Sequence, residues 1–309
     1  MTKHWGLIWW VCLVGIWGWN SAVQATDRDH VLILGKVSTT PRKHYRMLKP
    51  IVEYAARHLR DLGIEKGEVL LARDQWELGR MIRSGEVDWV TDSIFPAMLW
   101  VQMSNAEVFL KRWKTGVANY HTVFIARKDS SIESPGDLLG KTLALEDPGS
   151  TTAFFLPVIE LLQRGYPLKR LASPKDPPER GKINYVFARS EINISMWVSK
   201  GLVLGGAYNN LDWEAKDQTP PAVKKELRIF YRTAPVPRML ELVRGGLGTV
   251  VKERLRRVLL NAHLDPTAKE ALKSYQKTKR FESLSPHDRE VIQMTQEMIG
   301  KYRDLWLYQ

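Results

Sequence analysis

Cysteine is nearly absent from the chain, which has only Cys12 among its 309 residues. A single cysteine excludes an internal disulfide framework and a zinc site built from cysteines. Cys12 also lies within an N-terminal apolar run that we expect to be removed. The mature protein would then have no thiol nucleophile, and its folding would depend on its hydrophobic cores alone.

Sequence signals for catalysis and for metal binding are also lacking. The chain contains no G-x-S-x-G and no H-E-x-x-H motif. The segment LGKT (139–142) resembles the end of a phosphate-binding P-loop, but the required glycine is replaced by Pro135, and a strand is expected to follow. We therefore predict no enzyme activity, no metal and no cofactor, although a Ser/His/Asp set assembled only in three dimensions stays open. The histidines outside the N-terminus are not grouped at metal-ligand spacing: His30, His44, His58, His121, His263 and His287.

A long apolar run occurs at the N-terminus. Residues 1–25 begin with the basic MTKH, continue with LIWWVCLVGIWGW and end with the small-residue segment SAVQA. This order is typical of a secretory signal peptide cut after Ala25. A single membrane anchor is the alternative, but the run is short for one and ends like a cleavage site. The sequence therefore predicts export to the periplasm.

Basic residues outnumber acidic ones, with 46 Lys and Arg against 34 Asp and Glu, a formal charge of +12. Such a balance fits nucleic acid, an anionic membrane or a small anionic ligand. Export argues against nucleic acid, and the basic residues are scattered except for a denser, Pro-rich stretch at 164–182 that has the composition of a solvated loop. We expect a small anionic ligand.

Short apolar segments alternate with helical patterns through most of the chain, which predicts an α/β fold. Apolar runs at 31–37, 69–72 and 87–90 are separated by an amphipathic helix from Met47 to Leu62 and by a helix capped by Asp74 and Glu77. This alternation indicates a parallel sheet covered by helices. It resumes at 120–127, and the part after the strand at 228–234 is expected to be mostly helical. We predict two lobes, one of residues 27–118 plus 232–309 and one of residues 119–231, with a ligand cleft between them.

Three consecutive hydroxyl residues occur in the segment EDPGSTTAFFLP (146–157). Ser150 suits a helix N-cap, and the backbone amides of Thr151 and Thr152 would then lack partners inside the helix. These amides, the helix dipole and the hydroxyls could hold a tetrahedral oxyanion. The alternative is an ordinary capped helix start. Pro157 is expected to kink the helix, because it cannot donate to the carbonyl of Ala153.

The segment YHTVFIARKDSSIESPGDLLGKTLALEDPGSTTAFFLP (120–157) resembles the solute-binding proteins of phosphate, phosphite and phosphonate ABC transporters, the PhnD-like group. The likeness extends from about Val31 to about Leu259 and includes GEVDWVTDSIFPAML, FARSEINISMWVSKG and LRIFYRTAPVP. It implies a type II periplasmic binding fold, α/β in both lobes, that closes around a phosphorus oxyanion. It also implies a periplasmic monomer that works with an ABC permease in the inner membrane and is not an enzyme.

Matching to the family's motifs also gives candidate ligand contacts. The family's S-T-S signature corresponds to Ser150, Thr151 and Thr152, and its crossing-strand motif to Tyr120 and His121, with Thr122 in place of the usual serine. The turn after the third strand and the first helix add further candidates: Thr91, Asp92, Ser93 and Tyr45, the last with helix packing as the alternative.

Two positions depart from the family pattern. Glu191 stands where the family often has histidine, and Leu204 where it often has aspartate. Glu191 could pair with an amine, meet a protonated oxyanion or cap its helix. The choice among phosphate, phosphite and phosphonate stays open, as does a ligand without phosphorus. A sensor that reports to a membrane signalling partner is the alternative function, and an exported phosphoester hydrolase is a more distant one.

Overall fold

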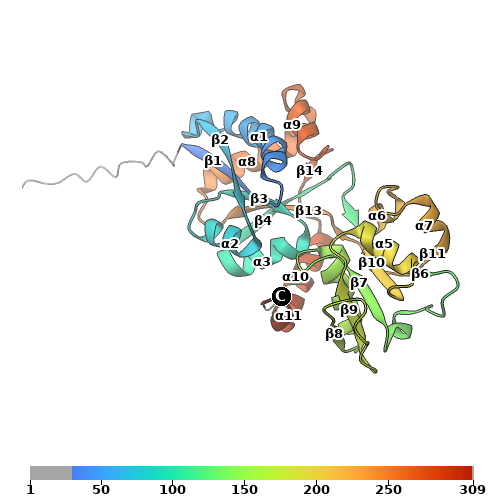
Figure 1. Ribbon diagram of the computed structural model, residues 1–309. Coiled ribbons are helices and arrows are strands. Elements are labelled where there is room, and N and C mark those ends of the chain that lie inside the picture. Colours follow the sequence, from blue (N-terminus) through green and yellow to red (C-terminus); the bar gives the residue numbers. More distant parts are fainter. Residues whose placement is uncertain (1–29, 308–309) are drawn as a thin grey trace, which may run out of the picture.

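The computed structural model describes residues 30–307, and the chain forms two α/β lobes (Figure 1). The signal peptide expected at 1–25, with Cys12, lies outside the described residues. Each lobe is a six-stranded sheet flanked by helices, as the two-lobed type II prediction requires.

The first sheet has the strand order β14-β4-β13-β3-β1-β2. Its strands are β1 (Val31–Val37), β2 (Lys66–Ala72), β3 (Trp89–Asp92), β4 (Ala106–Arg112), β13 (Met239–Arg244) and β14 (Phe281–Glu282). Strands β1, β2 and β3 are parallel, as their alternation with helices predicts.

One strand of this sheet lies outside the alternation that predicted parallel pairing, since β13 lies antiparallel between β3 and β4. The chain supplies this strand from a region that we expected to be mostly helical. Its centre holds Glu241, a fully buried carboxylate that pairs with Arg112 on β4 at 2.6 Å. Because Glu241 interrupts the short apolar run, the hydrophobic pattern does not identify this segment as a buried strand.

The second sheet has the strand order β11-β6-β10-β7-β9-β8. Its strands are β6 (Thr122–Arg127), β7 (Thr142–Leu145), β8 (Leu168–Arg170), β9 (Ile183–Phe187), β10 (Gly205–Asn209) and β11 (Leu227–Arg232). Strands β7, β8, β9 and β10 run parallel, so three of them, β7, β9 and β10, end together at the edge that faces the first lobe.

Helices cover both sheets, and the last two helices lie near the junction of the lobes (Figure 1). The first lobe carries α1 (Pro41–Arg57), α2 (Gln75–Arg83), α3 (Ile94–Ser104), α8 (Thr249–Asn261), α9 (Lys269–Ser274), α10 (Pro286–Lys301) and α11 (Arg303–Leu307). The second carries α4 (Leu156–Gln163), preceded by a π-helical turn η3 (Thr151–Phe155), together with α5 (Glu191–Ser199), α6 (Asn210–Glu214) and α7 (Pro221–Glu226).

Two crossing segments join the lobes and pair with each other. Strand β5 (Asn119–Tyr120) lies antiparallel to β12 (Val236–Pro237), with Tyr120 opposite Val236. The predicted residue boundaries of the lobes stay a prediction, whereas the crossing at these two segments is a feature of the structure.

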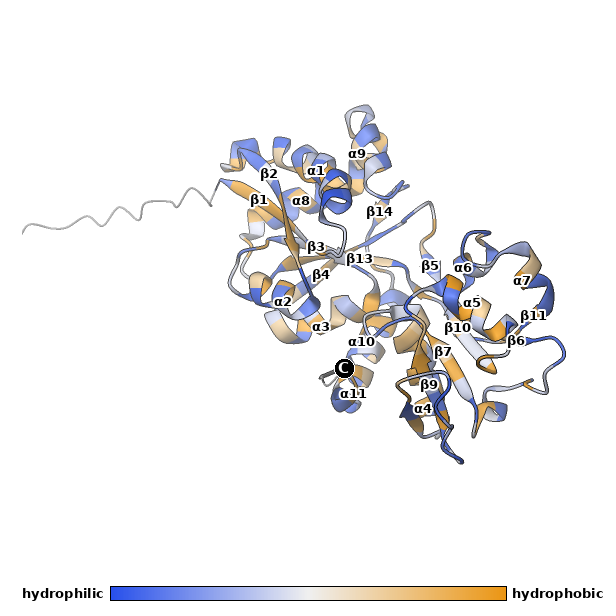
Figure 2. Cartoon of the chain, in the orientation of Figure 1, coloured by the Kyte–Doolittle hydropathy of each residue, from blue (hydrophilic) through white to orange (hydrophobic). Residues whose placement is uncertain are grey.

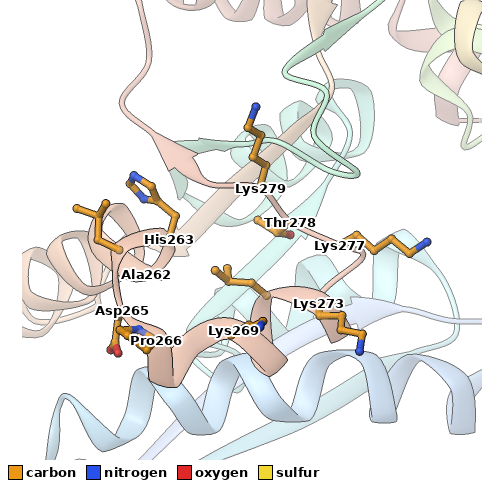
Figure 3. A pocket seen from close by; sticks show the side chains of 11 residues that line it. Ala262, His263, Asp265, Pro266, Lys269, Lys273, Lys277, Thr278 and Lys279 are labelled. Carbon is orange, nitrogen blue, oxygen red and sulfur yellow. The ribbon is translucent and has the colours of Figure 1, made fainter.

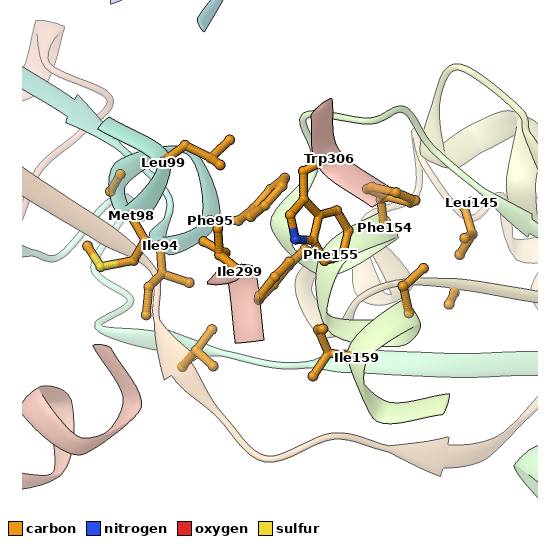
Figure 4. Close-up of a cluster of buried hydrophobic side chains, with 14 of the residues drawn as sticks. Ile94, Phe95, Met98, Leu99, Leu145, Phe154, Phe155, Ile159, Ile299 and Trp306 are labelled. Carbon is orange, nitrogen blue, oxygen red and sulfur yellow. The ribbon is translucent and has the colours of Figure 1, made fainter. Parts of the chain in front are cut away.

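The hydrophobic core continues across the junction of the lobes. Phe95 of α3 stacks on Phe155 of η3 with ring centroids 4.5 Å apart, and Trp306 of α11 lies against both rings and Phe154 (Figure 4). The central strands are hydrophobic, whereas helix faces such as those of α1 and α8 carry hydrophilic residues outward (Figure 2). Within residues 30–307, none of the helices combines the length and the apolar character that a bilayer crossing requires.

Candidate functional site

The three hydroxyl residues begin a helix, as their pattern predicts, but the first turn is π-helical. Ser150 is the N-cap, and its Oγ accepts from the amide of Ala153 at 3.1 Å. Pro157 has no N–H, so the carbonyl of Ala153 loses its usual helical partner. The amide of Glu146, directly after β7, donates to that carbonyl at 2.9 Å. The helix start is thereby attached to the end of the neighbouring strand.

Thr151 reaches the first lobe. Its Oγ1 donates to Oγ of Ser93 at 2.8 Å and accepts from the amide of Phe95 at 3.1 Å. Ser93 is the N-cap of α3 but makes no side-chain cap bond of its own. The hydroxyl of Thr151 therefore caps a helix of the opposite lobe, and the positive ends of two helix dipoles meet at this contact.

Tyr120, on the crossing strand, completes a group of three hydroxyls. Burial raises the pKa of its phenol, which hydrogen-bonds to Ser93 and Thr151. The adjacent Thr122 is also engaged, since its Oγ1 donates to the carbonyl of Thr152 at 2.7 Å. The structure thus brings together Tyr120, Ser93 and the hydroxyl helix start, which sequence separates by up to 58 residues.

Three carboxyl groups lie beside this helix start at the strand ends of the second lobe: Glu146, Glu191 and Asp212. Burial and the negative charge of Glu191 and Asp147 raise the pKa of Glu146 to about 8. Burial and the charge of Asp212 raise the pKa of Glu191 to about 7. Carboxyls with such values hold protons near neutral pH and can donate hydrogen bonds. Glu191 was predicted as a contact, whereas Glu146 and Asp212 were not.

The first lobe presents a different set of charges at its facing edge. Asp92, a predicted contact at the end of β3, accepts from Ser93 and pairs with Lys36 of β1 at 3.4 Å. Lys114 and Arg238 lie close enough to influence this region electrostatically. One face of the cleft is therefore rich in cations and the other in carboxyls.

Thr91 belongs to a buried network rather than to the open site. It is 1% exposed, and its hydroxyl donates to Glu241 at 2.9 Å and accepts from Arg112 at 3.3 Å. Trp89 and Tyr275 also donate to Glu241. Thr91 stays a predicted ligand contact that its hydrogen bonds do not favour.

Tyr45 and His121 are not brought to the three hydroxyls by any contact in the described residues. Tyr45 is 41% exposed on α1, where the ammonium of Lys49 lies 6.0 Å from its ring centre. His121 has a buried Nε2 without a hydrogen-bond partner, and burial, followed by the charge of Arg232, lowers its pKa.

A hollow of about 480 Å³ on the first lobe is lined by Lys269, Lys273, Lys277 and Lys279, beside His263 and Thr278 (Figure 3). It lies at α9 and shares no residue with the facing edges of the sheets. No group of three or more His, Cys, Asp or Glu side chains within residues 30–307 is placed to hold a metal ion.

Sequence reasoning found the hydroxyls because they are consecutive, and it missed the charged groups other than Asp92 and Glu191 because they are scattered. Glu146 is part of the segment that was singled out, and its place directly after a buried strand is the signal that could have identified it. Lys36, Lys114 and Arg238 come from three distant segments that only the sheet topology brings together.

Two lobes joined by paired crossing strands, with helix N-termini meeting at the facing edges, define a periplasmic-type binding protein. A family model described as "ABC transporter, phosphonate, periplasmic substrate-binding protein" matches residues 37–289. The chain therefore belongs to the family of periplasmic substrate-binding proteins of phosphonate ABC transporters.

Individual proteins are similar to this chain in sequence or in fold. A Xanthomonas citri protein is 40% identical over 89% of this chain and 99% of its own, with TM-scores of 0.84 when bound to chloride ion and 0.83 when bound to ATP, the latter covering 98% of its chain. The phosphonates-binding periplasmic protein of Escherichia coli is 24% identical over 82% of this chain and 72% of its own. PhnD1 from Prochlorococcus marinus, in complex with methylphosphonate, is 18% identical over 88% of this chain and 99% of its own, with a TM-score of 0.62, and shares the fold.

Proposed function

We propose that this protein captures a phosphorus oxyanion in the cleft between its lobes and delivers it to an ABC permease in the inner membrane. The observation that carries the proposal is the contact of Thr151 with Ser93 and with the amide of Phe95. This contact places hydroxyl donors and the starts of two helices at one point between the lobes.

The donors suit a tetrahedral oxyanion. First-turn amides of a helix lack partners within it, and the dipole favours negative charge at that end. Ser150 and Thr152 flank Thr151 in the chain, Tyr120 hydrogen-bonds to Thr151 and Ser93, and all three are proposed to contribute further polar contacts. An oxyanion between Thr151 and Ser93 would replace their direct bond and hold both lobes, which would couple binding to closure.

The ligand class is proposed as phosphonate, phosphite or phosphate. Related proteins in complex with methylphosphonate, with chloride ion and with ATP support an anionic ligand, and two of these three ligands contain phosphorus. The carboxyls of Glu146 and Glu191 would then act as hydrogen-bond donors to the oxyanion when protonated, or as partners of an amine on the ligand. The sensor function stays an untested alternative, and the hydrolase has no observation in its favour.

The test is a calorimetric titration of the mature chain with methylphosphonate, phosphite, phosphate, aminoethylphosphonate and sulfate. Thr151→Val keeps the side-chain shape but removes the hydroxyl, and we expect it to weaken the best phosphorus ligand by about tenfold or more. Thr249→Val, at the exposed start of α8, is the matched control and should bind as the wild type does. Absence of heat with every phosphorus anion, or an unchanged affinity in Thr151→Val, would contradict the proposal.

A further inference from the structure

Four charged side chains lie along the cleft edge of the first sheet. Lys36 is near the end of β1, Asp92 ends β3, Arg238 directly precedes β13, and Lys114 follows the end of β4. These strands are neighbours in the order β4-β13-β3-β1. Because β13 is antiparallel to β3 and β4, its beginning lies at the same edge as the ends of the other three. The four side chains therefore form one row facing the second lobe.

The row contains three cations and one carboxylate. Asp92 is shared with Lys36 at 3.4 Å and accepts from Ser93, so it cannot neutralise the whole row. Arg238 donates to two neutral oxygens, the carbonyl of Lys114 at 2.6 Å and Oγ1 of Thr115 at 2.5 Å. The ammonium of Lys114 has neither a hydrogen bond nor an ion pair to any residue in the described part of the chain.

Lys114 is consequently a partly buried cation among like charges. Burial first, followed by the charges of Arg112, Arg238 and Lys36, lowers its pKa to about 8, and Asp92 opposes these effects only in part. Arg112 is already paired with Glu241 in the core. Cations gathered in this way repel each other unless an anion lies among them.

The row adjoins the three hydroxyls. Asp92 is the residue before Ser93, and the charges of Asp92 and Arg238 both act on Tyr120. A ligand bound at Thr151 and Ser93 would therefore extend toward the row along the first lobe. The carboxyls of Glu146 and Glu191 occupy the second-lobe side, whereas the cations of the first-lobe side favour an additional negative group there.

We propose that Lys114, with Arg238 and Lys36, is a second anion subsite, and that the natural ligand carries a further negative group, a carboxylate or a phosphate, beside its phosphorus oxyanion. The inference rests on the proposed function, because it places the second group relative to the first. In this proposal Lys114 determines specificity by selecting ligands for their charge rather than for their shape.

The test compares probes with one and two anionic groups. We titrate the mature chain with methylphosphonate, phosphonoacetate and pyrophosphate, in the wild type, Lys114→Gln and Lys273→Gln. Lys273 lies at the distant lysine-lined hollow (Figure 3) and its side chain is 72% exposed, so it is the matched control. We expect wild type to bind phosphonoacetate or pyrophosphate at least about tenfold more tightly than methylphosphonate, and Lys114→Gln to remove most of that difference.

A second readout separates binding from a structural role. Removing an unpaired cation from among like charges should leave the ligand-free melting temperature unchanged or raise it, whereas loss of a structural lysine would lower it. Equal affinity for one- and two-anion probes in the wild type, or an undiminished difference in Lys114→Gln, would overturn the inference. If Lys114→Gln abolishes the preference while Thr151→Val has no effect on any probe, the subsite stands and the proposed oxyanion site fails. If no probe binds, both fail.

Discussion

The hydroxyl of Thr151, in the second lobe, donates to the hydroxyl of Ser93, in the first lobe, over 2.8 Å. Ser93 in turn donates to Asp92, and the amide of Phe95 donates to Thr151. A continuous chain of hydrogen bonds therefore crosses the cleft at the point where the oxyanion is proposed to bind. The energy of this bond can be measured without knowing the ligand.

We expect Thr151→Val and Ser93→Ala to show a coupling free energy of about 1 kcal/mol in a double-mutant cycle of urea unfolding. The two side chains share one hydrogen bond, so the second substitution costs less by the energy of that bond once the first has been made. Thr249, at the exposed start of α8 in the first lobe, gives a control cycle with Thr151 that should be additive. Additive losses in the Thr151 and Ser93 cycle would mean that the lobes do not meet there in solution.

Trp306 should contribute strongly to stability, although it lies close to the C-terminus. It is 8% exposed, and its ring contacts Phe95 of the first lobe and Phe154 and Phe155 of the second (Figure 4). We expect Trp306→Ala to lower the free energy of unfolding by about 3 kcal/mol, measured by denaturant titration. Trp76, which is 39% exposed, provides the control substitution Trp76→Ala. Similar losses in the two variants would contradict a bridging role for Trp306.

The raised pKa values of Glu146 and Glu191 predict that the stability of the folded protein decreases as the pH rises. The folded protein keeps protons on Glu146 and Glu191 up to about pH 8 and 7, while the unfolded chain releases them near the ordinary value of 4.5. The unfolded state binds fewer protons between these limits, so these two groups lower the free energy of unfolding as pH rises through this window. Below pH 4.5 their full stabilising effect is present.

Melting temperatures measured from about pH 5 to pH 8 should therefore decline less steeply in Glu191→Gln than in the wild type, because glutamine does not titrate. Glu270→Gln, at a side chain 77% exposed, should follow the wild-type curve. If Glu191→Gln shows the same dependence of melting temperature on pH as the wild type, the Glu191 carboxyl does not retain its proton in the folded protein.

Glu241→Ala should be among the most destabilising single substitutions. It would leave Arg112 buried without its partner, together with the donors of Trp89, Thr91 and Tyr275. Breaking such a buried pair costs about 3–5 kcal/mol. The exposed pair of Glu179 and Lys182 is the comparison, and Glu179→Ala should change stability by at most about 1 kcal/mol. A similarly small effect at Glu241 would contradict the network.

Local signals were sufficient for most of the fold. The apolar run at 31–37 forms β1, and most of the run at 120–127 forms β6, whose first five residues are buried. Asp74 caps α2 by accepting from the amide of Glu77 at 2.7 Å. Strand β13 could not be predicted from local pattern, because the stability of its central Glu241 depends on Arg112, which is 129 residues away.

The candidate site divides in the same way. Ser150, Thr151 and Thr152 adjoin in the sequence, and their role at a helix start follows from capping rules. The facing partner, Ser93, could be named only through resemblance, and Lys114 and Arg238 not at all. Ser93, Lys114 and Arg238 come together because of the strand order and because β13 is inserted antiparallel between β3 and β4. Neither feature can be predicted from a local residue pattern.

The bond from the amide of Glu146 to the carbonyl of Ala153 fastens the acid-bearing strand end to the hydroxyl-bearing helix start. This bond fixes the position of Glu146 relative to the hydroxyl-bearing helix start within the second lobe. An incoming ligand would first bind to this preorganised group of hydroxyls and the Glu146 carboxyl on the second lobe. The ligand would contact the cation row of the first lobe only when the lobes close. Recognition would then occur in two steps, first by the second lobe and then by the first.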